Sequence, residues 1–187
     1  MSNDGQDDWV RAQFPEGFKG WAVELGANDG ESLSNSLSLE REGWEVLCIE
    51  PMRAYADKAR KIRKRVLTCA CDDVPKDEVT LYTSGTLSTL STLDSGNSYV
   101  GESERTTVLT LNQCLMVAGF PRLDALFLDV DGIELRILKG LNLEKWRPKV
   151  AVVEDYYGPG GVREFMEQQG YEHVGDAGFD WLYLRRD

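Results

Sequence analysis

Acidic residues follow the apolar, strand-like stretches of this chain, and they are the first candidates for chemistry. The set comprises Glu24, Glu50, Asp72, Asp129 with Asp131, and Glu154 with Asp155. In an open parallel sheet, ligands bind outside the carboxyl ends of the strands, which lie along one edge. Carboxylates there can accept hydrogen bonds, act as general bases or hold a cation. The sequence therefore predicts an acidic ligand-binding edge.

The first of these stretches runs into a turn that contains two glycines, Gly26 and Gly30. Trp21, Val23 and Leu25 alternate like a strand, and we expect a helix after the turn. Glycine has no Cβ, so the backbone can turn sharply and approach a small molecule closely. The Gly-x-x-x-Gly spacing lacks the third glycine of the dinucleotide fingerprint. The turn therefore predicts a small-molecule cradle rather than a pyrophosphate site.

Glu50 lies at the end of the second stretch, 20 residues after Gly30. A carboxylate in this place can accept hydrogen bonds from both hydroxyls of a ribose. The acid at the end of the first stretch, Glu24, would repel a phosphate but suits a cation. A ligand with an amino-acid portion, a sulfonium and an adenosine fits both observations. S-adenosylmethionine is such a ligand.

The elements that must position these residues alternate between strands and helices. This alternation predicts an α/β fold with a doubly wound, mostly parallel sheet and an antiparallel hairpin at its C-terminal edge. The expected strands are residues 19–25, 45–50, 65–70, 78–83, 105–109, 124–130 and 148–154, with a hairpin of 171–175 and 179–185. The expected helices are residues 31–42, 52–63, 111–118, 133–139 and 160–169.

The composition favours one domain with no nucleic-acid partner and no membrane span. The net charge of −11 repels a phosphate backbone, and no apolar run approaches the roughly 20 residues that cross a bilayer. Residues 1–17 are expected to form an acidic flexible arm before a single domain over 18–187. The polar, acidic start differs from a secretory signal, which predicts a cytoplasmic protein. The basic segment 58–65 predicts a solvated helix face or, alternatively, a patch for an anionic partner.

The four cysteines are Cys48, Cys69, Cys71 and Cys114. The pair Cys69-Ala-Cys71 is a poor zinc signal, because there is no second Cys/His pair and His173 is the single histidine. We expect all four to be reduced thiols and predict no metal ligands among them.

Several motifs, in order along residues 19–155, resemble the FkbM family of methyltransferases. They are Glu24-Leu-Gly-Ala-Asn-Asp-Gly30, Cys48-Ile-Glu-Pro51, Thr110-Leu-Asn-Gln113, Leu128-Asp-Val-Asp-Gly-Ile-Glu134, Leu138-Lys-Gly140 and Pro148-Lys-Val-Ala-Val-Val-Glu154. The resemblance implies a seven-stranded class I methyltransferase (Rossmann-like) fold, S-adenosylmethionine as donor, and a hydroxyl of a sugar, glycan or polyhydroxylated metabolite as acceptor. Glu24 and Asp131 depart from the family's usual Asp and Glu.

The resemblance also implies roles for individual residues. The methionine part of the donor would lie against Glu24, Gly26, Ala27, Asn28 and Gly30, the ribose against Glu50, and the adenine beside Ala70, Cys71 and Asp72. Asp129 would stand near the sulfonium and the acceptor.

Methyl transfer from a sulfonium is an in-line displacement that benefits from a base on the acceptor hydroxyl. The candidate bases are Asp129, Asp131 and Glu154. Alternatively, these acids with Glu134 and Asp155 would hold a hard cation such as Mg²⁺.

For the residues that would line an acceptor site, the sequence leaves two interpretations open. Tyr156, Tyr157, Trp181 and Tyr183 would form a sugar-stacking wall, although Trp181 and Tyr183 equally suit the core. The Ser/Thr-rich residues 83–98 suit either a surface loop or a polar wall.

Two other functions remain open at this point. One is an S-adenosylmethionine-binding protein without transferase activity, acting as a scaffold or regulator. The other is a nicotinamide-dependent oxidoreductase, which the missing third glycine and the absent Tyr-x-x-x-Lys pattern disfavour.

Overall fold

A computed structural model describes residues 2, 4–84, 87–89, 102–130, 132–155 and 161–186. For residues 82–84, 87–89 and 102 it describes the backbone alone. Asp131, Tyr156, Tyr157 and much of the segment 83–98 lie outside these ranges, so the predictions made for them stay predictions.

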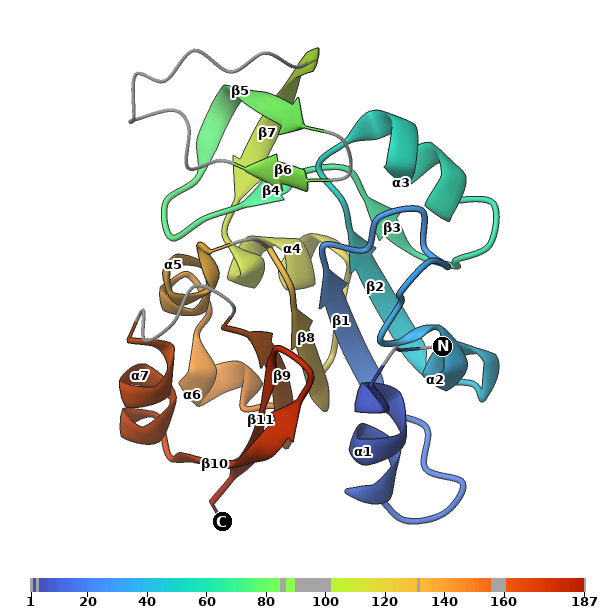
Figure 1. Cartoon of the computed structure of the whole chain (residues 1–187), viewed down its shortest axis with the longest axis vertical. Helices are drawn as coiled ribbons and strands as arrows, with labels where there is room; N and C mark the ends of the chain where they lie inside the picture. The colour runs from blue at the N-terminus through green and yellow to red at the C-terminus, as the bar shows by residue number, and fades with distance from the viewer. Residues whose placement is uncertain are drawn as a thin grey trace.

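The main sheet has seven strands in the order β10-β11-β9-β8-β1-β2-β3 (Figure 1). Its members are β1 (Trp21–Leu25), β2 (Glu45–Ile49), β3 (Val66–Leu67), β8 (Ala125–Leu128), β9 (Val150–Glu154), β10 (Tyr171–Ala177) and β11 (Asp180–Arg185). Four neighbouring pairs are parallel: β3 with β2, β2 with β1, β1 with β8, and β8 with β9. Strand β11 pairs with both β9 and β10 in the antiparallel direction. This arrangement confirms the predicted α/β fold with an antiparallel C-terminal edge.

A second, four-stranded sheet has the order β4-β7-β5-β6. It consists of β4 (Ala70–Cys71), β5 (Lys76–Ser84), β6 (Leu87–Thr89) and β7 (Glu102–Leu109). The expected single strand over residues 65–70 is therefore wrong, because the chain leaves the main sheet after β3 and enters the second sheet at Ala70. Figure 1 shows the second sheet above the main sheet.

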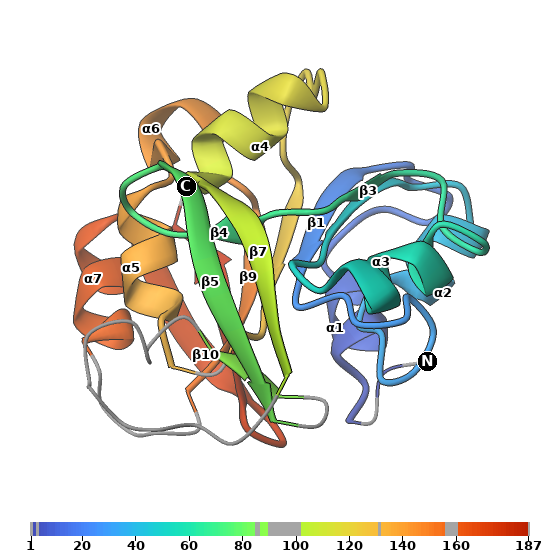
Figure 2. The same cartoon turned by 90° about the horizontal axis from the view of Figure 1, so that it is seen from above.

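Helices cover both faces of the main sheet (Figure 2). They are α1 (Gln6–Ala12), α2 (Leu37–Arg41), α3 (Arg53–Ala59), α4 (Leu111–Val117), α5 (Glu134–Lys139), α6 (Leu143–Trp146) and α7 (Val162–Gln168). Strand β1 shows how the two faces are filled, because its side chains alternate. Val23 and Leu25 pack in one core with residues of α4, α5 and α7, whereas Ala22 packs in the other with Val10 and Leu39 of α1 and α2.

The N-terminal residues contain a packed helix rather than a loose arm. Val10 of α1 is fully buried, and the rings of Phe14 and Phe18 stack at 4.7 Å beside Trp44. The Gln6 side chain also donates a hydrogen bond to Asp180 at 2.6 Å. The prediction of a flexible arm is therefore wrong for residues 6–12, since these apolar side chains outweigh the acidic composition of the segment.

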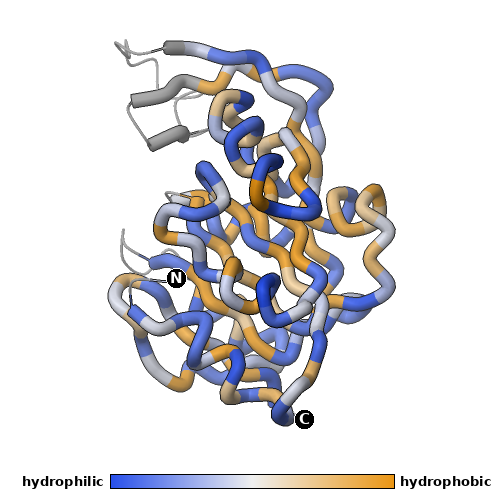
Figure 3. The backbone as a smooth tube through the Cα atoms, turned by 90° about the vertical axis from the view of Figure 1, so that its right-hand side faces the viewer, coloured by the Kyte–Doolittle hydropathy of each residue, from blue (hydrophilic) through white to orange (hydrophobic). Residues whose placement is uncertain are grey.

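Apolar residues concentrate in the central strands, and polar residues dominate the connecting segments (Figure 3). Among the described residues, no helix is both long and apolar enough to cross a membrane.

Candidate functional site

The loops that follow β1, β2 and β8 are held together by backbone hydrogen bonds. The amides of Gly26 and Ala27 donate to the carbonyl of Ile49 at 3.1 and 3.3 Å. The amide of Asp129 donates to the carbonyl of Leu25 at 3.4 Å. Three strand ends that are distant in sequence thus form one edge of the main sheet, as the parallel arrangement requires.

The two glycines of the first turn, Gly26 and Gly30, have different structural roles. Gly26 has φ 77°, and a Cβ on it would lie 1.9 Å from the carbonyl oxygen of Asp129, so a side chain cannot fit between β1 and β8. Gly30 has φ 82°, and its Cβ would lie 2.9 Å from that of Ala59 and 2.8 Å from Cγ of Arg63. Gly26 therefore permits contact between strand ends, whereas Gly30 permits packing against the region of α3.

A cavity of about 200 Å³ opens at this edge. Six residues predicted for the site line it: Gly26, Asn28, Glu50, Ala70, Cys71 and Asp129. The rest of its wall comes from Leu25, Leu33, Ile49, Pro51, Tyr55, Cys69, Leu81, Val130, Ile133 and Ile137. The cavity thus combines two carboxylates with a mostly apolar wall, which is typical of small-molecule sites.

Some of these wall residues could not be found from sequence. Leu81 belongs to β5 of the second sheet, and its approach to the edge of the main sheet depends on how the two sheets sit together. Ile133 and Ile137 lie one helical turn apart, a spacing that could have indicated a shared apolar face.

Glu50 is a buried acid that lines the cavity. Its two oxygens accept hydrogen bonds from the backbone amides of Asn28 at 2.9 Å and Met52 at 2.8 Å. Burial raises the pKa of Glu50 above its ordinary value of 4.5, the two amides oppose that rise, and the Glu104 carboxylate adds to it. A carboxylate has about four acceptor positions, so Glu50 can still accept hydrogen bonds from ligand hydroxyls.

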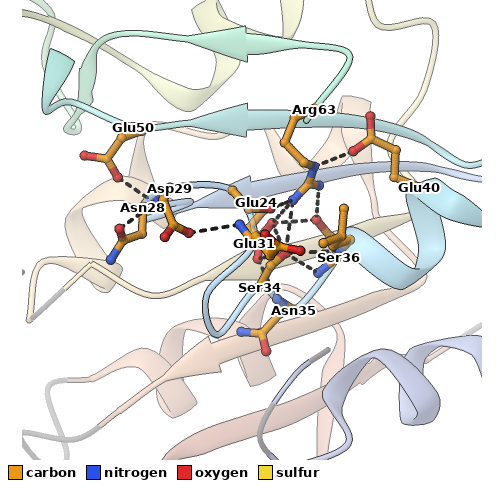
Figure 4. Close-up of polar contacts among 12 residues, drawn as sticks. Glu24, Asn28, Asp29, Glu31, Ser34, Asn35, Ser36, Glu40, Glu50 and Arg63 are labelled. Carbon is orange, nitrogen blue, oxygen red and sulfur yellow. Dashed lines mark hydrogen bonds and ion pairs between the residues drawn. The ribbon is translucent and has the colours of Figure 1, made fainter. Parts of the chain in front are cut away.

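Glu24, by contrast, does not line the cavity. Its carboxylate accepts hydrogen bonds from Ser34 Oγ at 3.0 Å, Asn35 N at 2.6 Å, Ser36 Oγ at 2.5 Å and Arg63 Nη1 at 3.2 Å (Figure 4). These contacts fix the loop between β1 and α2 to the sheet. The structure thus assigns the Glu24 carboxylate to the support of this loop, and its predicted contact with the donor stays a prediction.

Arg63 completes this buried network from the segment that follows α3. Its side chain is fully buried and also pairs with Glu40, donates to Ser36 Oγ at 2.7 Å, and donates to the Gly30 carbonyl at 3.1 Å. Arg63 thus belongs to the interior rather than to a solvated helix face.

Two neighbouring arginines of the basic segment also have acidic partners. Arg60 pairs with Asp57 at 2.7 Å and Arg65 pairs with Glu45 at 3.1 Å. Neither pair favours the alternative of an open patch for an anionic partner.

Four other predicted site residues do not line the cavity: Ala27, Gly30, Asp72 and Glu154. The Asp72 carboxylate is buried, pairs with Arg136, and lies 3.4 Å from Lys76 Nζ. Glu154 is the last residue of β9 and lies opposite Asp180 of β11. The structure therefore brings Asp129, rather than Glu154, to the cavity.

The two described residues of the predicted aromatic wall, Trp181 and Tyr183, lie away from the cavity. Tyr183 is fully buried, and the His173 ring lies 5.7 Å from it and 5.2 Å from Trp181. His173 Nε2 is 2.8 Å from Asp176 Oδ1. None of these aromatic side chains lines the cavity, so for Trp181 and Tyr183 the core interpretation holds.

Glu134 fixes the loop after β8. Its carboxylate accepts hydrogen bonds from the backbone amides of Gly132 at 2.9 Å and Val130 at 3.4 Å. Within the described part of the chain, the acids of this edge do not form a group of three ligands close enough for one metal ion. The possibility of Mg²⁺ therefore has no further support here.

Comparison with known proteins gives a consistent result. The profile of the methyltransferase FkbM domain matches residues 24–173. The methyltransferase sdnD of Sordaria araneosa is 39% identical over 62 residues, which are 33% of this chain and 22% of that protein. The chain thus spans less than a quarter of the length of that relative.

Solved structures share the fold at low sequence identity. The methyltransferase FkbM from Methylobacillus flagellatus superposes with a TM-score of 0.62 and 17% identity, over 98% of this chain and 48% of that one. A TehB-like SAM-dependent methyltransferase from Corynebacterium glutamicum gives a TM-score of 0.52 and 13% identity, over 100% and 89%. At these identities the similarity establishes the fold.

Proposed function

Because the chain belongs to the methyltransferase FkbM domain family, we propose that it transfers a methyl group from S-adenosylmethionine to a hydroxyl of a sugar, glycan or other polyhydroxylated metabolite. The observation that carries this proposal is Glu50, a buried acid at the end of β2 that lines the cavity and has acceptor capacity to spare. A ribose diol has two donors in the arrangement that such a carboxylate accepts.

We expect the other parts of the donor to contact the remaining predicted residues of the cavity wall. The turn of Gly26 and Asn28 would hold the methionine part, and Ala70 and Cys71 would lie beside the adenine. The apolar wall excludes water, which strengthens the polar contacts to the donor.

Asp129 is the residue that we assign to the acceptor. It lies at the end of β8, in the middle of the sheet, and lines the cavity. S-adenosylmethionine supplies an electrophilic methyl group when bound. Asp129 would orient the acceptor hydroxyl for in-line attack and take its proton as that proton becomes acidic. Asp131 stays a candidate for the same role.

Two measurements test the function. Titration calorimetry with S-adenosylmethionine, and separately with NAD, distinguishes a methyl donor site from a nicotinamide site; we expect heat of binding with S-adenosylmethionine and none with NAD. Mass spectrometry of sugars and hydroxylated metabolites incubated with protein and donor should show the mass gain of one CH2 group. Donor binding without any methylated product would favour a binding protein without transferase activity.

The variant Asp129→Asn separates chemistry from donor binding. We expect turnover to fall by about 10²- to 10⁴-fold, the usual contribution of a general base. Unfolding midpoint and donor affinity should stay near those of the parent. Full turnover in this variant would remove Asp129 from the chemistry.

A further inference from the structure

Three buried thiols meet beside the cavity. Cys69 lies in the segment that connects β3 of the main sheet to β4 of the second sheet, Cys71 lies in β4, and Cys114 lies in α4. Cys114 Sγ lies 3.7 Å from Cys69 Sγ and 3.6 Å from Cys71 Sγ, and all three sulfurs lie within 4.8 Å of one another. The fold therefore creates a three-sulfur cluster that the sequence spacing does not indicate.

The spacing of the sulfurs agrees with ligation of a single metal ion. Zinc binds thiolates at about 2.3 Å, so two sulfurs on a tetrahedral zinc are roughly 3.8 Å apart. Two of the three distances already match that value closely. The third pair, Cys69 and Cys71, lies within 4.8 Å, so its sulfurs need to close by at most about 1 Å to reach the tetrahedral spacing.

The surroundings favour a soft cation over a hard one. The cluster belongs to the apolar core on the face that α4 and α5 cover, and its three potential ligands are all sulfur. Thiolates select zinc and other thiophilic cations, whereas Mg²⁺ and Ca²⁺ prefer oxygen. Cys69 and Cys71 also line the cavity, which gives a cation and a fourth ligand such as water a route to the sulfurs.

We propose that Cys69, Cys71 and Cys114 bind one thiophilic divalent cation of the zinc type. Binding breaks three S–H bonds, forms three metal–sulfur bonds and releases three protons to solvent. No oxidation state changes. Because two of the ligands belong to the cavity wall, the cation would fix β4 against α4 at the place where the wall is built from both sheets.

Cadmium titration tests this proposal directly, because cadmium–thiolate bonds absorb in the near ultraviolet. The full chain is first treated with a chelator and a phosphine reductant without oxygen. We expect the thiolate band to saturate at one cadmium ion per chain, with native mass spectrometry showing the same ratio. Zinc should displace the band.

The matched variants are Cys114→Ala and Cys48→Ala. Both thiols are fully buried, but Cys48 lies in β2 and packs in the core of the opposite sheet face. Removing a ligand should weaken cadmium binding by more than about 100-fold, a larger loss than removal of an outer-shell partner causes. Cys48→Ala should bind like the parent. Cys69→Ser supplies a second ligand variant if Cys114→Ala does not fold.

Three results would overturn the proposal. The first is the absence of a thiolate band in the reduced, folded parent protein. The second is equal cadmium affinity in Cys48→Ala and the ligand variants. The third is a disulfide within the cluster that persists under reductant, seen as the loss of two hydrogen masses. None of these results depends on methyl transfer, so failure here is distinguishable from failure of the proposed function.

Discussion

Glu24 and Glu50 stand at the ends of neighbouring parallel strands, and both are almost completely buried, with 4% and 5% exposure. Glu24 is surrounded by two serine hydroxyls, a backbone amide and a buried arginine. Glu50 accepts hydrogen bonds from two backbone amides and lines a cavity. The two glutamates thus occupy equivalent positions at the ends of adjacent strands, but Glu24 belongs to a buried polar network and Glu50 to the cavity wall.

The difference shows that the partners of a strand-end acid matter more than its position. A buried carboxylate must be compensated by hydrogen bonds and charge. Around Glu24 this compensation is supplied by the protein, which turns the acid into a support for the loop. Around Glu50 the compensation is weaker, so its pKa is raised by burial and the site suits a ligand with hydroxyl donors.

The largest effect should come from removing the cation beside Glu24. Arg63→Ala leaves Glu24 and Glu40 buried without their guanidinium, and the free energy of unfolding should fall by about 3–5 kcal/mol. Urea denaturation measures this change. Arg65→Ala is the control, since its half-exposed pair with Glu45 should contribute at most about 1 kcal/mol. Equal losses in the two variants would show that the buried network around Arg63 stabilises the fold no more than the partly exposed Arg65–Glu45 pair does.

A smaller loss should follow from Gly26→Ala, because the new Cβ would clash with the carbonyl of Asp129. The positive φ alone costs about 1–2 kcal/mol, and the clash adds to it. Gly119→Ala is matched, with φ 68° and no atom within 4 Å of the added Cβ. Thermal unfolding should show the greater destabilisation at Gly26. A smaller loss there than at Gly119 would contradict the close approach of β1 and β8.

The smallest expected effect is a dependence of donor affinity on pH, which comes from the ionisation of Glu50. Donor hydroxyls need the ionised carboxylate, so affinity for S-adenosylmethionine should fall as the pH is lowered through the pKa of Glu50. Burial raises that pKa, so the fall should begin above the pH expected from the ordinary value of 4.5. Titrations at several pH values would show the step, with circular dichroism confirming that the protein stays folded. The same step in Glu50→Ala would assign it to another group.

Much of the main sheet was predictable because its strands have simple patterns. Residues 125–128 and 150–153 are continuous apolar runs, and the structure places both at the centre of the sheet, buried on both faces. The position of Glu50 at the end of a strand could be predicted because it lies 20 residues after Gly30 of the glycine turn. Glu24 shows the same signal but does not line the cavity, and its contact with Arg63, 39 residues away in the sequence, could not be predicted from spacing.

The second sheet and the thiol cluster were not predictable in the same way. Strand β4 has two residues, too few for any periodicity, so nothing in the sequence separates it from β3. The approach of Cys114 to Cys69 and Cys71, like that of Leu81 to the cavity, depends on tertiary packing. Local patterns locate elements, but the contacts between two sheets are set by the whole chain.

We expect Glu50, rather than Glu24, to be the acid that holds the donor, because Glu50 lines the cavity and Glu24 does not. Titration calorimetry with S-adenosylmethionine on the parent protein and Glu50→Ala tests it most directly, with Glu45→Ala as a control at the opposite end of β2. We predict that Glu50→Ala weakens donor binding at least about tenfold, the equivalent of 1.4 kcal/mol, while Glu45→Ala binds like the parent. Unchanged affinity in a folded Glu50→Ala protein would show that Glu50 does not hold the donor.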